Sequence, residues 1–256
     1  MTGLGLVVRQ ARFTNRAFWR NPASAFFTFA FPLMFLVIFT VVIGRGTVVV
    51  AGARIDQARY YVAAMAGFSV VTACFTNVAM SVTYQREAGI LKRTRGTPLP
   101  GWAFLSGRVL HATFVAALLV VITGAFGAAL YGAAVPSGAP LARFALTVVV
   151  GALAFSALGL ATTALVPNAD AAPAIVNAIV LPLLFISGIF FPVDDAPGWF
   201  LAIGSFFPVR PFADAMRASF YGAPFAFEWS DVLVLALWGL AGLALATRFF
   251  TWEPRR

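Results

Sequence analysis

The chain has 256 residues, of which 61% are hydrophobic and 11% charged, and its mean hydropathy is +0.90. A soluble domain carries about 25% charged and about 45–50% apolar residues, so this composition excludes a soluble globular protein and indicates an integral membrane protein with its outer face in lipid. The formal net charge is +9, and a single cysteine, Cys74, with a single histidine, His111, excludes an internal disulfide and a histidine–cysteine metal site.

The first predicted element is an amphipathic helix over residues 1–22. Its arginines follow one another at spacings of three, four and four, which places them on one helix face about 80° wide, opposite an apolar face. Such a helix is expected to lie in the membrane interface, and the Asn21-Pro22 pair ends it. A disordered basic tail is the alternative, although a tail would not require this periodicity. The arginines are Arg9, Arg12, Arg16 and Arg20.

Long intervals without charge predict six membrane-spanning helices. The intervals place the spans at about 24–43, 61–83, 109–131, 142–165, 172–191 and 230–250, and about 20 residues suffice for the hydrocarbon core. The last span reaches this length only if Arg248 extends its side chain to the interface. The predicted fold class is therefore an all-α integral membrane protein, with residues 1–256 forming one transmembrane domain.

Residues 192–228 are apolar but interrupted by proline and glycine. The run APGWFLAIGSFFPV is too short to span, and PFADAMRASFYG reads as a short amphipathic helix closed by Gly222. These two pieces predict a re-entrant helical hairpin on the outer side, between spans five and six. An ordinary outer loop is the alternative.

The basic residues predict the orientation. With both termini in the cytoplasm, twelve of the 18 basic residues lie on the cytoplasmic side, as the positive-inside rule requires. The positive charge is therefore explained by topology and gives no reason to expect nucleic-acid binding.

The segment YQREAGILKRTRGTPLP, residues 84–100, lies between the second and third spans. Charged residues flank a small apolar knob, glycines permit sharp turns and prolines stop the helix. A short rigid helix of this kind suits docking into a groove of a partner protein, whereas an ordinary positively charged loop would not need this order. The predicted docking residues are Arg86, Glu87, Gly89, Ile90, Leu91, Lys92, Arg93, Thr97 and Pro98.

This segment resembles the cytoplasmic coupling region of ABC transporter type-2 permeases, which typically reads E-R-E-x-G-T-L-x-R-L-x-x-T-P. All the docking residues except Ile90 and Lys92 match it, and Ile90 replaces the usual threonine. Residues 181–222 are similar to the family's fifth span and outer hairpin, with S-G-x-F-F-P at 187–192. With the basic amphipathic start and six spans, the resemblance covers essentially the whole chain.

The resemblance implies an exporter of the bacterial plasma (inner) membrane, built from two membrane subunits and two ATPase subunits. The second membrane subunit would be an identical or a homologous permease, and ATP and Mg would be bound by the separate ATPase subunit. The chain itself lacks a P-loop, since its only lysine, Lys92, is followed by Arg93. We therefore expect no catalytic residues, no metal and no cofactor in this chain, and direct contact with membrane lipids.

Polar residues inside the spans and aromatic residues near the outer end are candidates for a substrate pathway or gate. Polar side chains within a membrane either hold helices together or line a path. The candidates are Thr72, Thr76, Asn77, Asn177, Phe190, Phe191, Trp199, Phe206 and Phe207.

The favoured substrate is an amphipathic drug-like molecule or lipid, because the coupling segment looks closest to the drug-export branch and the spans lack a charged cavity. Export of a lipid-linked polysaccharide is the alternative within the family. A membrane enzyme would need paired carboxylates or a histidine cluster, and Asp194-Asp195 has no histidine partner. A secondary transporter would need an internal repeat and charge within the membrane, neither of which the sequence indicates.

Overall fold

The computed structural model describes residues 3–42, 46–50, 52–222 and 225–253, which form a helical bundle with one small hairpin. Residues 1–2 of the expected interfacial helix, residue 43 of the first expected span, and Arg45, Arg255 and Arg256 lie outside these ranges. The elements are α1 (Gly3–Trp19), α2 (Pro22–Val42), β1 (Thr47–Val50), β2 (Ala53–Asp56), α3 (Gln57–Val71), the π-helical turn η1 (Thr72–Thr76), α4 (Asn77–Glu87), α5 (Ile90–Arg95), α6 (Gly101–Tyr131), α7 (Ala139–Thr162), α8 (Ala172–Ile186), α9 (Gly198–Phe206), α10 (Val209–Tyr221) and α11 (Trp229–Phe249).

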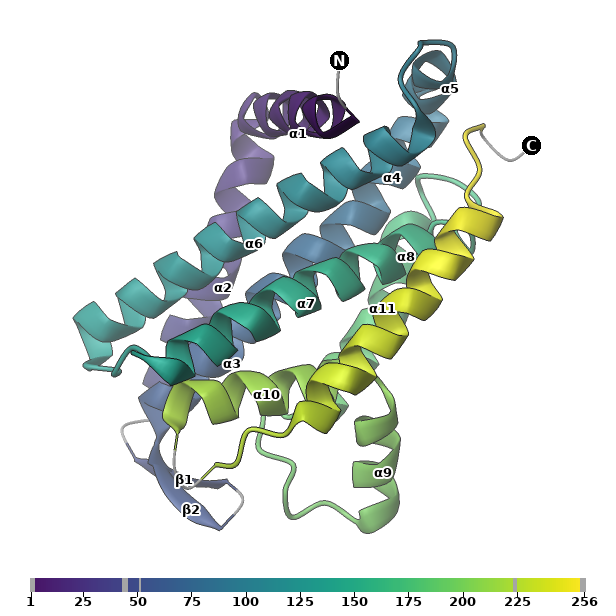
Figure 1. Cartoon of the computed structure of the whole chain (residues 1–256). Coiled ribbons are helices and arrows are strands. Elements are labelled where there is room, and N and C mark those ends of the chain that lie inside the picture. The colour runs from purple at the N-terminus through teal and green to yellow at the C-terminus, as the bar shows by residue number, and fades with distance from the viewer. Residues whose placement is uncertain (1–2, 43–45, 51, 223–224, 254–256) are drawn as a thin grey trace.

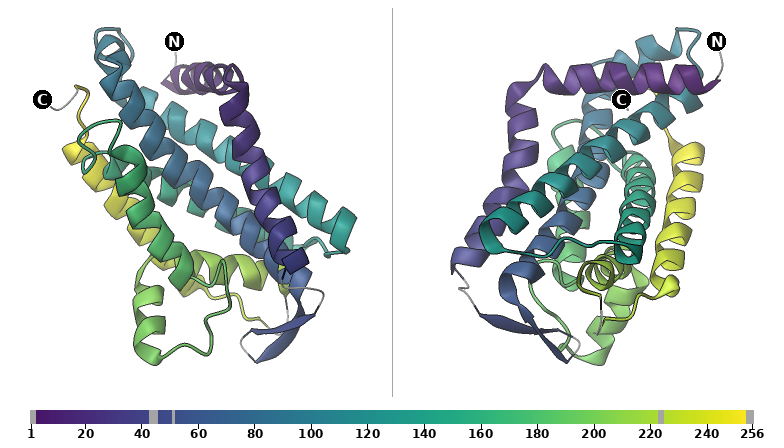
Figure 2. Two further views of the ribbon diagram at one scale, coloured as in Figure 1. Left: turned by 180° about the vertical axis from the view of Figure 1, so that it is seen from behind. Right: turned by 60° about the vertical axis from the view of Figure 1, so that its left-hand side comes forward.

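Two ends of the molecule can be distinguished (Figure 1). One end carries α1, α5 and the neighbourhood of both chain termini, and we call it the α5 end. The opposite end carries the β-hairpin, α9 and α10, and we call it the hairpin end. Helix α1 lies across the α5 end, at a steep angle to α2, while the long helices run between the two ends (Figures 1 and 2).

Within the described residues, five helical segments are long and apolar enough to cross a membrane: Pro22–Val42, Gln57–Glu87, Gly101–Tyr131, Ala139–Thr162 and Trp229–Phe249. Their outward faces carry large apolar side chains such as Phe26, Val121 and Leu237, which are 66%, 65% and 55% exposed. Surfaces of this kind are unfavourable in water and suit contact with lipid.

The fifth expected span is shorter than the sequence suggested. Helix α8 has 15 residues, which corresponds to about 22 Å, less than the roughly 30 Å of a hydrocarbon core. It ends because the chain turns at Gly188, which adopts a left-handed φ of 76°. The residues from Gly188 to 191, which we assigned to the span, belong to this turn and the chain beyond it.

The combined helix α3–η1–α4 lies at the centre of the bundle, and most of the residues in its apolar part are buried. Neighbouring helices approach it closely through small residues. A Cβ added at Gly159 of α7 would lie 2.7 Å from the Phe75 carbonyl oxygen, and one at Gly127 of α6 would overlap the Val62 side chain. The bundle therefore depends on backbone approach at glycines, as is common for membrane helices.

One small β-hairpin accompanies the helices of this mainly helical fold. Strands β1 and β2 pair antiparallel, with Thr47 opposite Asp56 and Val50 opposite Ala53. The β-branched run Thr47–Val50 favours a strand, and Gly52, in the turn between the strands, adopts a φ of 77°. Asp56 then caps α3 by accepting hydrogen bonds from the backbone N–H of Ala58 (3.0 Å) and of Arg59 (3.3 Å).

Candidate coupling site

The α4–α5 corner forms the projecting tip of the α5 end (Figure 1). The chain leaves α4 after Glu87 and reverses at Gly89, whose φ of 69° is left-handed. The Gly89 N–H donates to the Arg86 carbonyl at 3.1 Å, closing the turn. Helix α5 then runs for six residues before the Thr97–Pro100 segment leads into α6.

The residues of α5 divide into an exposed surface and an anchor. Ile90 is 44% exposed, and Lys92 and Arg93 are also exposed. Leu91 is fully buried and belongs to the hydrophobic core. The helix therefore presents an apolar tip beside exposed positive charges, while Leu91 fixes it to the bundle. Thr97 and Pro98, at the end of the expected docking segment, are exposed.

Arg86 lies inside the protein, with only 2% of its surface exposed. Its Nη1 donates to the Thr163 carbonyl at 2.9 Å and to the Thr251 hydroxyl at 3.3 Å, and its Nη2 donates to the Val166 carbonyl. Thr163 is the C-cap of α7, so the guanidinium satisfies carbonyls that the end of a helix leaves without partners. Arg86 thus joins α4 to the end of α7 and to the segment after α11.

Glu87 forms a hydrogen bond with a distant loop. Its Oε2 accepts a hydrogen bond from the Ala169 N–H, in the loop between α7 and α8. Lys92 lies 4.0 Å from Glu253, but both side chains are more than half exposed, so this ion pair contributes little. At the end of α4, directly before α5, Arg86 and Glu87 thus bind the C-cap of α7, the loop between α7 and α8, and the segment after α11.

The structure thus separates the residues that we grouped as docking residues. Ile90, Lys92 and Arg93 are accessible to a partner, whereas Arg86 and Leu91 are internal. The sequence motif could not make this distinction, because the partners of Arg86 lie about 80 and 165 positions away along the chain.

Helix α1 carries its arginines on the outside. Arg9, Arg12, Arg16 and Arg20 are all exposed. The opposite side packs on α6, where Ala11 is buried and a Cβ added at Gly107 would lie 2.7 Å from Gln10. Phe13 and Trp19 remain 67% and 48% exposed, so α1 offers apolar rings as well as positive charge at this end.

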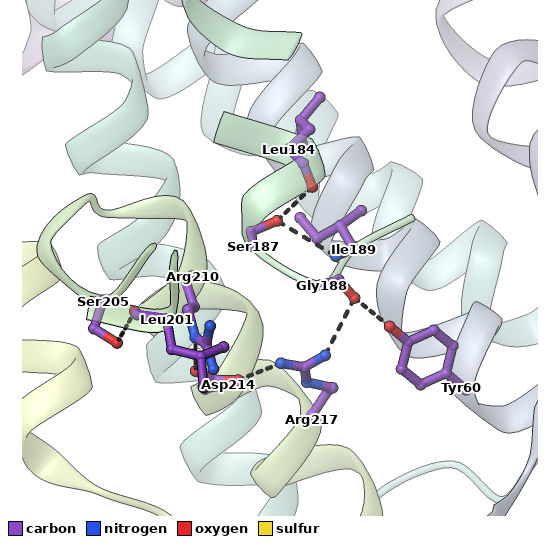
Figure 3. A network of polar contacts seen from close by, with 10 residues as sticks. All are labelled: Tyr60, Leu184, Ser187, Gly188, Ile189, Leu201, Ser205, Arg210, Asp214 and Arg217. Atoms are coloured by element: carbon purple, nitrogen blue, oxygen red, sulfur yellow. Dashed lines mark hydrogen bonds and ion pairs between the residues drawn. The ribbon is translucent and has the colours of Figure 1, made fainter. Parts of the chain in front are cut away.

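A second polar network lies at the hairpin end, around the turn after α8 (Figure 3). The carbonyl of Gly188 accepts hydrogen bonds from the Tyr60 hydroxyl and from Arg217 Nη1, the latter at 3.2 Å. Asp214 accepts from Arg217 and lies 3.6 Å from Arg210. Burial is the largest single influence and disfavours the charge on Arg217, but the interactions with Asp214, Tyr60 and Asp194 together outweigh it and raise the pKa of Arg217. The network fastens the turn after α8 to α3 and α10.

The aromatic gate candidates occupy different surroundings. Phe190 is buried and lies 6.1 Å from Phe35 and 5.6 Å from Phe68, between ring centroids. Phe206 and Phe207 contact Trp238 of α11, with centroid distances of 5.6 and 5.8 Å. Phe191 and Trp199 are 47% and 67% exposed. Phe190 therefore packs against α2 and α3, whereas the pair at the end of α9 packs against α11.

The polar pathway candidates also differ from one another. The Thr72 hydroxyl donates to the Phe68 carbonyl at 2.9 Å, within its own helix. The Thr76 hydroxyl is buried and has no hydrogen-bond partner. Asn77 lines a cavity near the α5 end, and Asn177 is half-buried on α8. The structure brings Asn77 together with Gln85, Arg108 and His111, which the sequence analysis did not include.

Comparisons with known proteins agree with this architecture. The model of the family described as ABC-2 type transporter matches residues 7–221. The chain is 28% identical over 139 residues to the probable multidrug ABC transporter permease YbhR of Escherichia coli (strain K12), covering 54% of this chain and 37% of that protein. It is 33% identical over 105 residues to nodulation protein J of Rhizobium leguminosarum bv. viciae, covering 41% of this chain and 40% of that protein.

A longer match extends over 217 residues of YvfS from Bacillus subtilis (strain 168), which is named as a transport permease. The identity is 26%, and the match covers 84% of this chain and 85% of that protein. The chain thus spans less than half the length of the E. coli and Rhizobium relatives that it matches, but most of the length of the Bacillus protein.

Proposed function

Because the chain belongs to the ABC-2 type transporter family, we propose that it is the permease subunit of an ATP-driven exporter. The family and the apolar helices identify a multi-pass membrane protein with the role of an ABC transporter permease. Export as the direction, and an amphipathic drug-like molecule or lipid as the substrate, are the further parts of the proposal. The name of YbhR refers to multidrug transport, which supports this choice of substrate.

The observation that carries the proposal is the construction of the α4–α5 corner. A projecting six-residue helix presents Ile90 and three basic side chains to a partner. Directly behind it, Arg86 binds the C-terminal end of α7, and Glu87 binds the loop between α7 and α8. A partner that moves α5 would therefore move α7 and α8 with it, which is what an energy-coupling contact requires.

The proposed partner at this corner is a separate ATPase subunit that binds ATP and Mg. The α5 end would then face the cytoplasm of a bacterial cell, with both termini, and the hairpin end would face outward. This orientation places Arg9, Arg12, Arg16 and Arg20 at the cytoplasmic surface, as the positive-inside rule favours. A second permease, identical or homologous, would complete the translocation path.

We expect the purified chain to hydrolyse no ATP by itself, because its only lysine is followed by Arg93 and forms no P-loop. Hydrolysis in nanodiscs should appear when the cognate ATPase subunit is co-purified. A variant of that ATPase lacking its P-loop lysine provides the control, and it should abolish the activity. Hydrolysis that persists with the control, or with the permease alone, would contradict the proposal.

A further inference from the structure

A cavity of about 290 Å³ opens at the α5 end, between α1, the start of α2, α4, α5 and α6. One part of its wall is apolar, with Phe13, Phe18 and Phe104. The remainder is polar, and no carboxylate is present among the side chains that line it. The main polar lining residues are Gln10, Asn21, Asn77, Ser81, Arg108 and His111.

Arg108 is the principal charged group of this cavity, and only 6% of its surface is exposed. Its Nη1 donates to the Ser81 hydroxyl at 3.4 Å and its Nη2 donates to the Gln85 side-chain oxygen, both neutral acceptors. Its Nε is buried without a hydrogen-bond partner. Across the described part of the chain, no carboxylate lies within ion-pair distance of it. A buried cation without a counter-ion is costly, so the site is suited to an anion.

Other donors surround the guanidinium. His111 lies one helical turn further along α6, and its Nδ1 is buried without a partner. Asn77 and Ser81 reach the cavity from α4, and Asn21 reaches it from the start of α2. Arginine combined with amides and hydroxyls on several sides suits a group with several acceptor oxygens, such as phosphate. The single positive charge matches the single negative charge of a phosphate diester.

The size and position of the cavity indicate what kind of molecule the phosphate would belong to. The volume of about 290 Å³ lies at the lower end of the range of pockets for whole drug-sized ligands, about 300–1,000 Å³, so the cavity has room for a head group. Phe13 lines it and is 67% exposed, which leaves an apolar surface beside the opening. Basic amphipathic helices such as α1 lie at the level of lipid head groups. We propose that this cavity binds the phosphate group of an anionic amphipathic molecule, with Arg108 as its counter-ion.

Binding can be measured with the full-length chain in a neutral detergent, using short-chain phosphatidylglycerol as the probe. Saturable binding to the unmodified chain is expected. Arg108→Gln should weaken it at least about tenfold, since hydrogen bonds to a charged group contribute roughly 1.5–3 kcal/mol. Arg248→Gln removes the same charge from an exposed site on α11 and should leave binding unchanged. The diacylglycerol with the same chains, which lacks phosphate, should not compete.

A second variant keeps the test valid if Arg108→Gln fails to fold. Ala17 lines the cavity from α1 and is exposed, so Ala17→Phe should fill the cavity without disturbing Arg108, and should also weaken binding. Equal binding by the unmodified chain and whichever of these variants folds would overturn the proposal. Inorganic phosphate should compete only at much higher concentration. If inorganic phosphate competed at the same concentration as the lipid, the cavity would be a site for free phosphate. That result would overturn the proposal that the ligand is an amphipathic molecule.

Discussion

Replacing Arg86 with methionine is expected to lower the free energy of unfolding by roughly 1–3 kcal/mol for each buried carbonyl that loses its donor. Methionine is long enough to fill much of the same space but donates no hydrogen bond. The buried carbonyls of Thr163 and Val166 would lose the guanidinium that pairs with them, and unpaired buried acceptors are costly. Thermal unfolding of the purified chain in detergent, followed by tryptophan fluorescence, measures the effect.

Arg93→Met is the matched control for this variant. Arg93 lies in the same segment but is exposed, so its replacement should change stability by less than about 0.5 kcal/mol. A similar loss for both variants would mean that positive charge in this segment, rather than the contacts of Arg86, supports the fold. A stable Arg86→Met variant would show that the joint between α4, α7 and the segment after α11 is dispensable.

Gly89→Pro is expected to abolish the stimulation of ATP hydrolysis by the permease while leaving the helical bundle folded. Proline fixes φ near −65°, whereas Gly89 adopts 69°, and the N–H that donates to the Arg86 carbonyl would also be lost. The corner would have to re-form, so α5 would point in a different direction. Hydrolysis by the reconstituted complex and the far-UV circular dichroism of the permease test the two parts of this expectation.

Gly89→Asn tests whether the effect of Gly89→Pro comes from the changed backbone conformation or only from the loss of glycine. Asparagine adopts left-handed φ values more readily than most residues, and a Cβ at this position would meet nothing within 4 Å. This variant should therefore retain most of the stimulation. Normal hydrolysis with Gly89→Pro would leave the corner as an ordinary connection between helices.

The long helices could be predicted from sequence because charge interrupts the apolar intervals. Helices α2, α6, α7 and α11 overlap the predicted intervals, since a segment that leaves water must satisfy its own backbone hydrogen bonds. The reversal after α4 could also be anticipated, because Gly89 and the later prolines limit the conformations of that stretch. These features depend on local chemistry along the chain.

What could not be predicted depends on contacts between distant segments. The charge on Arg86 suggested an accessible docking residue, but the carbonyls of Thr163 and Val166 draw it into the interior. Arg108 was counted only among the basic residues of the cytoplasmic side, since nothing in its neighbourhood in the sequence indicates that α1 and α4 enclose it. The hairpin was not predicted, although the β-branched run of β1 favours a strand.

Cross-linking from single cysteines tests the central claim most directly, namely that an ATPase subunit docks on α5. In a Cys74→Ser background, cysteine would replace Ile90 at the α5 tip in one variant and Ser205 on α9 in the other; both positions are exposed. A short thiol-to-amine cross-linker added to the assembled complex should join the ATPase to position 90 and not to position 205. Cross-linking from position 205, or none from position 90, would contradict the account.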